Sequence, residues 1–449
     1  MFASLKHSEN YALFRHTRWQ LQKAVKFEYH RLQARFKRSQ GKATYIGVTG
    51  SSGKTTTAAL TGHIPSGVDK TFVQAVDNEL KDFVEALRSA PLPDAYSIWE
   101  MGAFRPGSLK PLVDLVRPHV GIVTLVALEH KSNFHTCEAV QQDKQTLVEA
   151  LPREGLAILN HDDSRVSAMA SRTKARVKTF GKQGGDYVVS SICADNPAGL
   201  TLSISHAGQT IDLKTLLTGA HQYVPIVAAF ACARELGVPA SVCQERIASF
   251  KPVFGRCSVH AIDNGPIFIV DSVKAPYHSM SLAIDMMANF SAPRKRIIIG
   301  QISDITGTSR TKYRDAYRAS RDVADQVIFI GDNAHRSKAT PEEIAAGRFV
   351  QKHKVEDAAR YLRDTAIPGE VILLKSAQNL HLERLFLNFL YEVRCWKQPC
   401  KLDCTCVECG HYDLPQEVHP RELQVQRKPW QLDEVRDPSA HQSTRARQT

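Results

Sequence analysis

A glycine-rich loop between an apolar strand and a helix constrains the fold of this chain more than any other feature. Residues 45–57 read Tyr-Ile-Gly-Val-Thr-Gly-Ser-Ser-Gly-Lys-Thr-Thr-Thr, so that Gly47, Gly50 and Gly53 are spaced three apart. Glycines let the backbone turn its N–H groups inward, and the N-terminus of the following helix adds positive potential. Such a loop cradles phosphates, which predicts that the chain binds a nucleoside triphosphate.

The loop is a variant of the usual phosphate-binding motif. The usual spacing puts a glycine at position 48, where this chain has Val48, and the extra glycine lies one place earlier. Lys54 can reach the β- and γ-phosphates, and the Thr55 hydroxyl can ligate Mg²⁺. The residues expected to contact the nucleotide here are Gly50, Ser51, Ser52, Gly53, Lys54, Thr55 and Thr56.

Further motifs follow the loop in a fixed order. They are Trp99-Glu-Met-Gly102, Val120–Thr124 with Glu129-His130, Leu151–Asp163, Gly219-Ala-His221, Phe254-Gly-Arg256, Asp271-Ser272 and Gly369–Lys375. Together with the variant loop they resemble the Mur ligases, especially the Mur ligase that adds D-alanyl-D-alanine, over roughly residues 44–390. The resemblance implies an ATP-dependent ligase that joins a carboxylate to an amine through an acyl phosphate. It also implies ATP and Mg²⁺ as cofactors.

The resemblance assigns metal ligands and catalytic residues. Thr55, Glu100 and His130 are the expected magnesium ligands, and Lys54, His130 and Arg256 the expected catalytic side chains. Lys144 is expected to be catalytic as well: relatives often carry a carbamylated lysine there, which can ligate a second magnesium ion. The family usually has a small residue before this lysine, whereas this chain has Asp143.

The remaining expected contacts surround the nucleotide and the incoming substrate. By resemblance Asn160, Arg256 and Asp271 lie near the nucleotide, and Lys375 near the substrate. Two segments depart from the family pattern. Where the family has His-Asn-x-x-Asn, this chain has His221-Gln222 and then Pro225, so both amides are altered. Val273–Tyr277 replaces Tyr-Asn-Ala-Asn-Pro. Adenine contacts and acceptor choice are therefore expected to differ, and Lys274 is either an anion-binding residue or simply part of a loop.

Hydrophobic patterning predicts an α/β fold. Strands alternate with helical stretches from Tyr45 to about Phe250, which is typical of a mainly parallel sheet with crossover helices and an antiparallel edge near 187–204. We expect a central P-loop ATPase domain at 44–253 and a C-terminal Rossmann-like α/β domain at 254–392. A Cys-rich segment and a disordered tail are expected at 393–449.

The amino-terminal segment is strongly basic. Residues 1–43 hold ten Lys or Arg against Glu9 and Glu28, a large share of the net charge of +12. An apolar stripe of one helix is formed by Leu21, Val25, Tyr29, Leu32 and Phe36. We expect this stripe to pack on the neighbouring domain. The alternative is peripheral binding to an anionic membrane or an acidic partner. No nucleic-acid module is recognised, and no secretory signal, which favours the cytoplasm.

The position of the phosphate loop bears on the substrate. It begins 46 residues into the chain, and one or two helices precede it, so no UDP-binding domain is expected there. We therefore expect an amino acid or small peptide to be joined to a carboxylate without UDP, in specialised metabolism. The alternatives are a processive ligase of the poly-γ-glutamate or folylpolyglutamate type, and a nucleotide-binding scaffold without activity.

Five of the ten cysteines fall within fifteen residues. They are Cys395, Cys400, Cys404, Cys406 and Cys409. This density suggests a zinc site, with Cys400, Cys404, Cys406 and Cys409 as candidate ligands. The spacing of the first three is too compressed for a standard zinc ribbon. A redox-active or merely reduced cluster is the alternative interpretation.

Overall fold

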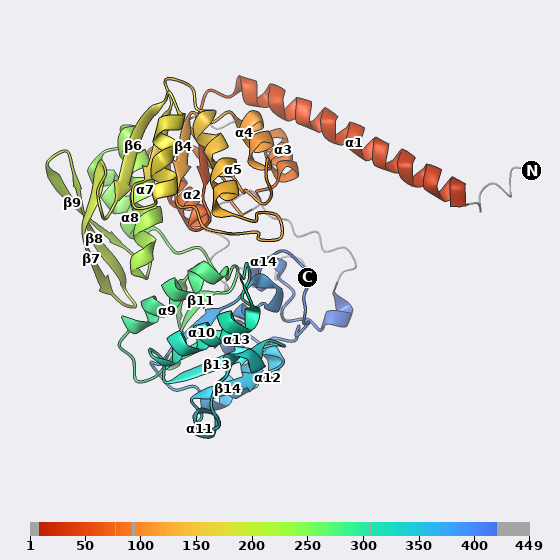
Figure 1. The fold of residues 1–449 in the computed structure, drawn as a ribbon, viewed down its shortest axis with the longest axis vertical. Coiled ribbons are helices and arrows are strands. Elements are labelled where there is room, and N and C mark those ends of the chain that lie inside the picture. Colours follow the sequence, from red (N-terminus) through yellow and green to blue (C-terminus); the bar gives the residue numbers. More distant parts are fainter. Residues whose placement is uncertain (1–8, 77, 92–94, 306, 420–449) are drawn as a thin grey trace, which may run out of the picture.

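The computed structural model consists of two α/β lobes and a long helix that projects from the first lobe (Figure 1). It describes residues 9–76, 78–91, 95–305 and 307–419. The segment 420–449, expected to be a disordered tail, lies outside the described residues. Within the described ranges, no helix is both long and apolar enough to cross a membrane.

The first lobe is built on a nine-stranded sheet with the order β2-β3-β1-β4-β5-β6-β7-β8-β9. Strands β2 to β7 are parallel, and β8 and β9 add an antiparallel edge. The strands are β1 (Thr44–Thr49), β2 (Thr71–Gln74), β3 (Tyr96–Glu100), β4 (Val120–Val123), β5 (Leu156–Asn160), β6 (Arg176–Gly181), β7 (Tyr187–Asp195), β8 (Gly199–His206) and β9 (Gln209–Thr215). The helices are α1 (Glu9–Gln40), α2 (Lys54–His63), α3 (Leu80–Ser89), α4 (Leu109–Val116), α5 (Cys137–Glu149), α6 (Ser164–Ser167), α7 (Tyr223–Glu235) and α8 (Ala240–Ser249).

The second lobe has a six-stranded sheet with the order β10-β11-β15-β12-β13-β14, in which only β10 is antiparallel to its neighbour. Its strands are β10 (Ser258–Ala261), β11 (Ile267–Asp271), β12 (Lys295–Ile299), β13 (Gln326–Ile330), β14 (Phe349–Lys352) and β15 (Val371–Lys375). Its helices are α9 (Met280–Ala288), α10 (Ser309–Arg321), α11 (Pro341–Ala345), α12 (Val355–Thr365), α13 (Glu383–Leu390) and α14 (Cys406–Cys409). The predicted α/β fold class is confirmed.

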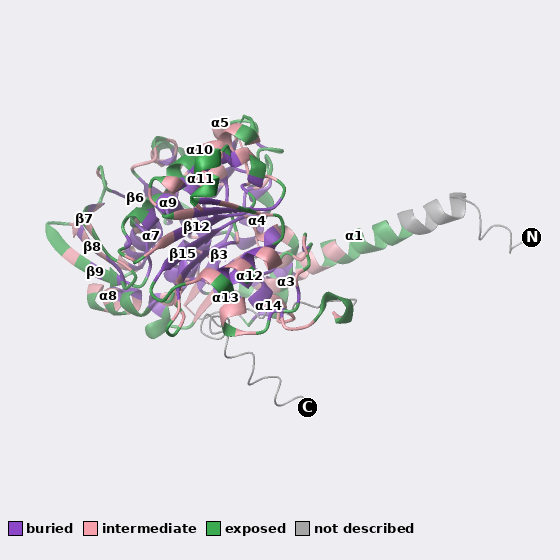
Figure 2. Ribbon diagram, turned by 90° about the horizontal axis from the view of Figure 1, so that it is seen from below, coloured by how far each residue is buried: buried purple, intermediate pink, exposed green. Residues whose placement is uncertain are grey.

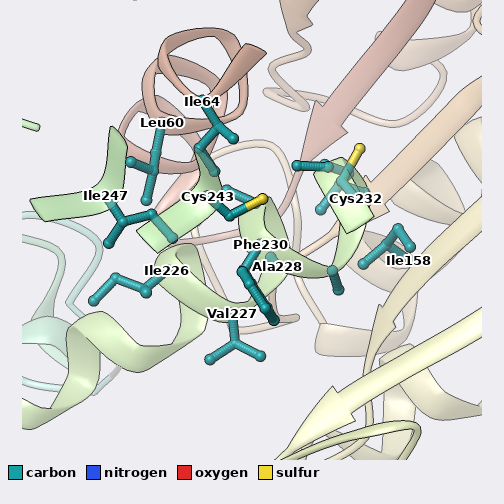
Figure 3. Packing of buried hydrophobic residues seen from close by; sticks show 14 of the residues in the cluster. Leu60, Ile64, Ile158, Ile226, Val227, Ala228, Phe230, Cys232, Cys243 and Ile247 are labelled. Atoms are coloured by element: carbon teal, nitrogen blue, oxygen red, sulfur yellow. The ribbon is translucent and has the colours of Figure 1, made fainter. Parts of the chain in front are cut away.

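Helix α7 anchors the core of the first lobe. Its residues 224–233 are all buried, as expected for a helix that is apolar on every side. Figure 3 shows Ile226 and Phe230 of α7 close to Leu60 of α2, with Ile247 of α8 beside them. This packing fixes α2, and with it the helix N-terminus that follows the glycine-rich loop.

The apolar stripe of helix α1 does not pack as expected from the sequence. The stripe predicted to pack on the neighbouring domain is solvent-exposed, with Val25 69% and Phe36 68% accessible. Instead, the carboxyl end of α1 is held by Arg38, which donates to the carbonyl oxygens of Val116 and Arg117 and lies over the Tyr45 ring. Figure 2 shows the projecting part of α1 as exposed where it is described. Binding to a membrane surface or an acidic partner stays a prediction.

The glycine at position 50 yields a prediction about the loop. A Cβ at Gly50 would lie 1.8 Å from Thr124 Oγ1, the hydroxyl that donates to Ser52 O at 2.7 Å. We expect Gly50→Ala to displace Thr124, lower the free energy of unfolding by more than about 2 kcal/mol and abolish ATP binding. The measurements are urea unfolding and nucleotide titration.

A matched control separates steric collision from backbone strain. Gly107 has a φ of 79°, and a Cβ added there would have no atom of the described residues within 4 Å. Gly107→Ala should cost only the strain of a left-handed residue, about 1–2 kcal/mol, and should leave ATP binding intact. Equal losses in the two variants would contradict the assigned role of Thr124.

Candidate active site

The candidate site is a cavity of about 330 Å³ between the two lobes. Parallel strands β1, β3, β5, β11 and β15 all end beside it, in keeping with the general position of ligands in open α/β sheets. Its lining includes Ser51, Ser52, Gly53, Lys54, Thr55, Thr56, Glu100, Asn160, Arg256, Asp271 and Lys375. Eleven residues expected from the sequence are thus brought to one cavity by both lobes.

The phosphate loop connects β1 to α2 and is held by its own polar groups. Lys54 Nζ donates to the carbonyl oxygen of Gly50 at 2.6 Å. Ser51 Oγ donates to Ala127 O at 2.8 Å and accepts from Ala127 N at 3.0 Å. Gly53, at a φ of 77°, precedes the first turn of α2. The loop therefore presents the N-terminus of α2 to the cavity, which suits it to bind an anion.

Glu100 is fixed at the carboxyl end of β3, next to the loop strand. Its Cα is the register partner of Val48 in β1. Its carboxylate accepts from Val76 N at 2.8 Å and from Asn78 Nδ2 at 3.3 Å, and the side chain is buried. These donors orient a negative group at the mouth of the loop, where a divalent cation would bind phosphate oxygens.

A buried chain of charges lies behind the loop. Glu129 Oε2 lies 3.8 Å from Lys54 Nζ, and Glu129 Oε1 lies 2.5 Å from Lys144 Nζ. Lys144, on α5, is fully buried and does not line the cavity. Burial favours a neutral Glu129, but the ammonium groups of Lys144 and Lys54 outweigh burial and hold the Glu129 pKa far below its ordinary value. Sequence reasoning named Glu129 only as part of a motif.

Lys144 and His130, which lie next to Glu129 in space or in sequence, have lowered pKa values. Burial lowers the pKa of Lys144, more strongly than its ion pair with Glu129 raises it. Burial also lowers the pKa of His130, which has a φ of 48° and follows Glu129 directly. A neutral imidazole is the form that ligates a metal ion. His130 and Gly50 do not line the cavity, so the expected roles of His130, Gly50 and Lys144 stay predictions.

The nucleotide side of the cavity is formed by β5 and the start of α7. Asn160 is buried and donates to Thr124 O at 2.7 Å, which ties β5 to the loop region. Asp162 accepts from the Tyr223 hydroxyl at 2.7 Å. His221 Nε2 lies 4.0 Å from Cys257 Sγ. Burial lowers the pKa of the His221 imidazole to about 4. This wall therefore combines the Asp162 carboxylate with an aromatic hydroxyl and a neutral imidazole.

The second lobe contributes three cations. Lys375, at the end of β15, donates to Asp271 at 2.6 Å and to Lys274 O at 3.0 Å. Arg256 and Lys274 line the cavity. The Lys274 side chain is open to the cleft but surrounded by protein, and this desolvation, with the nearby charges of Lys54 and Arg256, lowers its pKa to about 8. The lobe thus faces the phosphate loop with positive charge.

A second cavity of about 230 Å³ adjoins the first. The two share Glu100, Arg256 and Lys274 in their linings. Its far wall comes from the Cys-rich segment, which contributes Asp403, Thr405, Val407 and Glu408. Sequence reasoning missed this wall because nothing in the local pattern indicates where an irregular carboxy-terminal segment folds back.

The cysteines expected to bind zinc lie outside both cavities. Cys400, Cys404, Cys406 and Cys409 line a separate cavity, but the structure does not bring them together as a ready four-thiol site. Among the described residues, the metal-ligating side chains whose donor atoms lie within 4.8 Å of one another are His381, Glu383 and Cys406. The four-cysteine ligand set is thus not supported, because the segment folds with a histidine among its thiols.

Comparisons with known proteins agree with this geometry. The Mur ligase middle domain matches residues 48–233, and the Mur ligase glutamate ligase domain matches residues 255–378. The chain belongs to the Mur ligase family. This membership confirms the expected enzyme class, an ATP-dependent acid–amino-acid ligase.

Individual relatives are distant. The UDP-N-acetylmuramoyl-tripeptide–D-alanyl-D-alanine ligase of Mycobacterium tuberculosis is 26% identical over 362 residues, which cover 75% of this chain and 71% of the relative. The Escherichia coli enzyme of the same name is 24% identical, with 78% and 77% covered. A solved MurF ligase from Thermotoga maritima in complex with ADP has a TM-score of 0.70 at 22% identity, covering 81% of this chain and 83% of that one.

The buried charge chain yields a prediction about stability. Replacing Glu129 with Gln leaves Lys144 without its carboxylate partner in a fully buried position. We expect Glu129→Gln to lower the free energy of unfolding by about 3–5 kcal/mol at pH 7. As a control, Glu85→Gln removes the exposed pair with Arg88 at 2.8 Å and should cost less than about 1 kcal/mol.

The difference in unfolding free energy between wild type and Glu129→Gln should depend on pH, because the pKa of Glu129 is lowered in the folded chain. Glu129 ionises at lower pH in the folded chain than its ordinary 4.5. Its stabilising contribution is therefore present above about pH 4.5 and is lost as the pH falls toward the folded value. Urea unfolding at several pH values should show the gap between wild type and Glu129→Gln narrowing on acidification. A constant gap would contradict the assignment.

Proposed function

We propose that this protein forms an amide bond between a peptide carboxylate and an amino acid or dipeptide, driven by ATP. A carboxylate oxygen attacks the γ-phosphorus of ATP and ADP leaves, which gives an acyl phosphate. The amine then attacks the acyl carbon, loses a proton, and expels inorganic phosphate as the C–O bond breaks. The observation that carries the proposal is a phosphate loop facing the cations of a second lobe across one cavity.

The donor groups beside the loop fit magnesium. The Thr55 hydroxyl and the oriented Glu100 carboxylate are oxygen ligands of the kind that Mg²⁺ accepts, and the role of His130 as a ligand comes from the family resemblance. When bound, the ion would neutralise charge on the phosphates. Lys54 and Arg256 would supply positive charge as the γ-phosphoryl group moves.

Lys144 is suited to the carbamate that the family resemblance suggests. Carbamate formation needs a neutral amine, and burial lowers the pKa of Lys144 toward that form. The product carboxylate would stand beside Glu129, so it would need a cation in place of the present ion pair. The test is a carbon-13 carbamate signal in protein equilibrated with labelled CO₂. The signal should vanish in Lys144→Ala, and its absence in wild type would exclude the carbamate.

The substrates named for the relatives are candidates for this chain, but two altered segments point to differences. By name, the enzymes to which this chain is similar use UDP-N-acetylmuramoyl-tripeptide and D-alanyl-D-alanine. The expectation of a carboxylate without UDP, in specialised metabolism, gains no support from them. The altered segments at 221–225 and 273–277 support a difference in acceptor or adenine contacts. Both kinds of carboxylate therefore belong in the assay.

The deciding experiment is phosphate release from ATP and Mg²⁺, with the acid and the amine supplied singly and together. We expect release only when both are present, with a product whose mass equals acid plus amine minus water. Lys54→Ala should reduce the rate at least about 100-fold. Lys110→Ala, which removes an exposed partner of Asp114 on α4, should leave the rate unchanged.

The alternatives give different results in the same assay. A processive ligase would produce a ladder of products from one amine. A nucleotide-binding scaffold would bind ATP with no turnover that depends on an acid. Retained turnover in Lys54→Ala would contradict the role given to the loop.

Lys274 supplies a prediction about pH. Its ammonium group, at the junction of the two cavities, is placed to attract the substrate carboxylate and the acyl phosphate. With a pKa of about 8, it should lose this charge as the pH rises, so kcat/KM for the acid should fall above pH 8. Lys274→Gln should lower kcat/KM by about 10- to 100-fold at pH 7, the value of a charged hydrogen bond.

The matched variant is Lys274→Arg, which keeps its charge at high pH. Its activity should hold through the pH range where wild type declines. If Lys274→Gln retained the alkaline decline of wild type, another group would be responsible and this assignment would be wrong.

A further inference from the structure

The five clustered cysteines surround a cavity of their own, away from the candidate active site. The cavity has a volume of about 570 Å³ and lies against the second lobe. Its lining includes Cys395, Cys400, Cys404, Cys406, Cys409, His381, His411 and His419. All five cysteines are free thiols. The segment 391–419 that carries them has one turn of α-helix, α14, and one of 3₁₀-helix, so regular backbone hydrogen bonds do little to hold it.

His381 is prepared as a ligand on the opposite wall. It is only 1% exposed, and its Nδ1 lies 3.0 Å from Glu383 Oε1. Its Nε2 is buried and makes no hydrogen bond with the described residues. An unpartnered buried nitrogen is costly unless something binds it. A carboxylate on one ring nitrogen with the other nitrogen free is the arrangement that orients metal-binding histidines.

Glu383 orients this ring rather than ligating a metal itself. Its Oε1 also accepts the N–H of Cys406 at 3.0 Å, and its Oε2 accepts the Ser272 hydroxyl at 3.0 Å. The carboxylate is fully buried. Because both oxygens already accept hydrogen bonds from protein donors, the carboxylate fixes His381 and the backbone of Cys406 in relation to each other.

Arg384 holds the sulfur of Cys406 in place. Its Nε donates to Cys406 Sγ at 3.1 Å, and its Nη1 donates to Lys397 O at 2.8 Å. The guanidinium is 1% exposed. The Cys406 sulfur is thus fixed by a buried guanidinium, and it lies within 4.8 Å of a ring nitrogen of His381. Thiolates are the form of cysteine that binds metal ions.

Cys400 lines the same cavity as His381 and Cys406. The ligand atoms of His381 and Cys406 lie within 4.8 Å of each other. We propose that His381 Nε2 and the thiolates of Cys400 and Cys406 bind a zinc ion, with a third thiolate of the same cavity as fourth ligand. Three cysteines and one histidine form a common structural zinc set, and a histidine held by a carboxylate fits zinc better than an all-thiolate iron–sulfur cluster.

The zinc ion would brace the wall of the second cavity. Cavity-lining residues Asp403, Thr405 and Val407 alternate in sequence with Cys404 and Cys406 of the metal cavity. The segment therefore separates the two spaces, with one side chain facing each in turn. A metal ion on one side fixes the position of the polar groups on the other. The metal proposal itself rests only on the residues around His381 and does not depend on the proposed ligase activity.

The first test is the metal content of the full chain, purified without chelators and after incubation with zinc. We expect one zinc ion per chain. X-ray absorption should show a mixed shell, with sulfur at about 2.3 Å and nitrogen at about 2.0–2.1 Å. Cobalt substituted for zinc should give the absorption bands of a tetrahedral thiolate site. This measurement uses the wild-type chain and needs no variant.

Variants locate the site. His381→Ala and Cys406→Ser should lose the bound zinc, and Glu383→Gln should weaken zinc affinity by about 10- to 100-fold, as expected when an orienting group is removed. Cys193→Ser is the control, because Cys193 is exposed on β7 and lies outside this cavity. Hydrogen exchange of residues 403–408 should rise in wild type when a chelator removes the metal, while ATP affinity should change little.

Three results would overturn the proposal. One is a chain that binds less than about a tenth of an equivalent of zinc after incubation. Another is iron together with acid-labile sulfide, which would mean a cluster instead of zinc. The third is an all-sulfur shell with full zinc retention in His381→Ala, which would remove the histidine from the ligand set. Circular dichroism of each variant shows whether a loss of metal reflects a loss of fold.

Discussion

The buried carboxylate of Glu129 between two lysines is the constraint on which the rest of the site depends. It is the charged partner of Lys144 on α5 and lies within 3.8 Å of Lys54 on the phosphate loop. Two ammonium groups and one carboxylate leave an excess of positive charge in a region of low dielectric. Arg256 and Lys274 add to it from the second lobe. This arrangement attracts an anion with several charges, such as the phosphates of ATP.

The two lobes contribute different groups to the candidate active site. The first lobe provides the loop and Glu100, at the carboxyl ends of parallel strands, and the buried charges of Glu129 and Lys144 behind them. The second lobe provides cations on the opposite wall and, through the carboxy-terminal segment, one side of the adjoining cavity. Residues from both lobes must approach the same phosphoryl group, so the relative position of the lobes sets the geometry of reaction.

Much of the fold could be predicted because its signals are local. Apolar runs that end at a polar residue or a glycine-rich turn identified β1, β3, β5, β11 and β15, and the order of motifs placed the loop and Glu100 in one site. The short strands β2, β10 and β14 lacked such signals, whereas β4, which is equally short, was identified because it lies within a family motif.

Long-range features could not be read in this way. The alignment of Glu129 with Lys54 and Lys144 depends on how β4, the loop and α5 pack. The exposure of Val25 and Phe36 shows the limit of periodicity, because an apolar stripe does not say what covers it. His381 lies fourteen residues before the first clustered cysteine, so sequence spacing gave no reason to count it with the thiols.

The fate of the carboxylate oxygen during turnover shows whether the enzyme activates a carboxylate. With the substrate carboxylate labelled with ¹⁸O, attack of that carboxylate on the γ-phosphorus places one labelled oxygen in the inorganic phosphate released with the amide. We expect one ¹⁸O atom per phosphate, measured by mass spectrometry in ordinary water. Phosphate without label, with both labelled oxygens retained in the acid, would show that ATP is hydrolysed by water and that the chain does not activate a carboxylate.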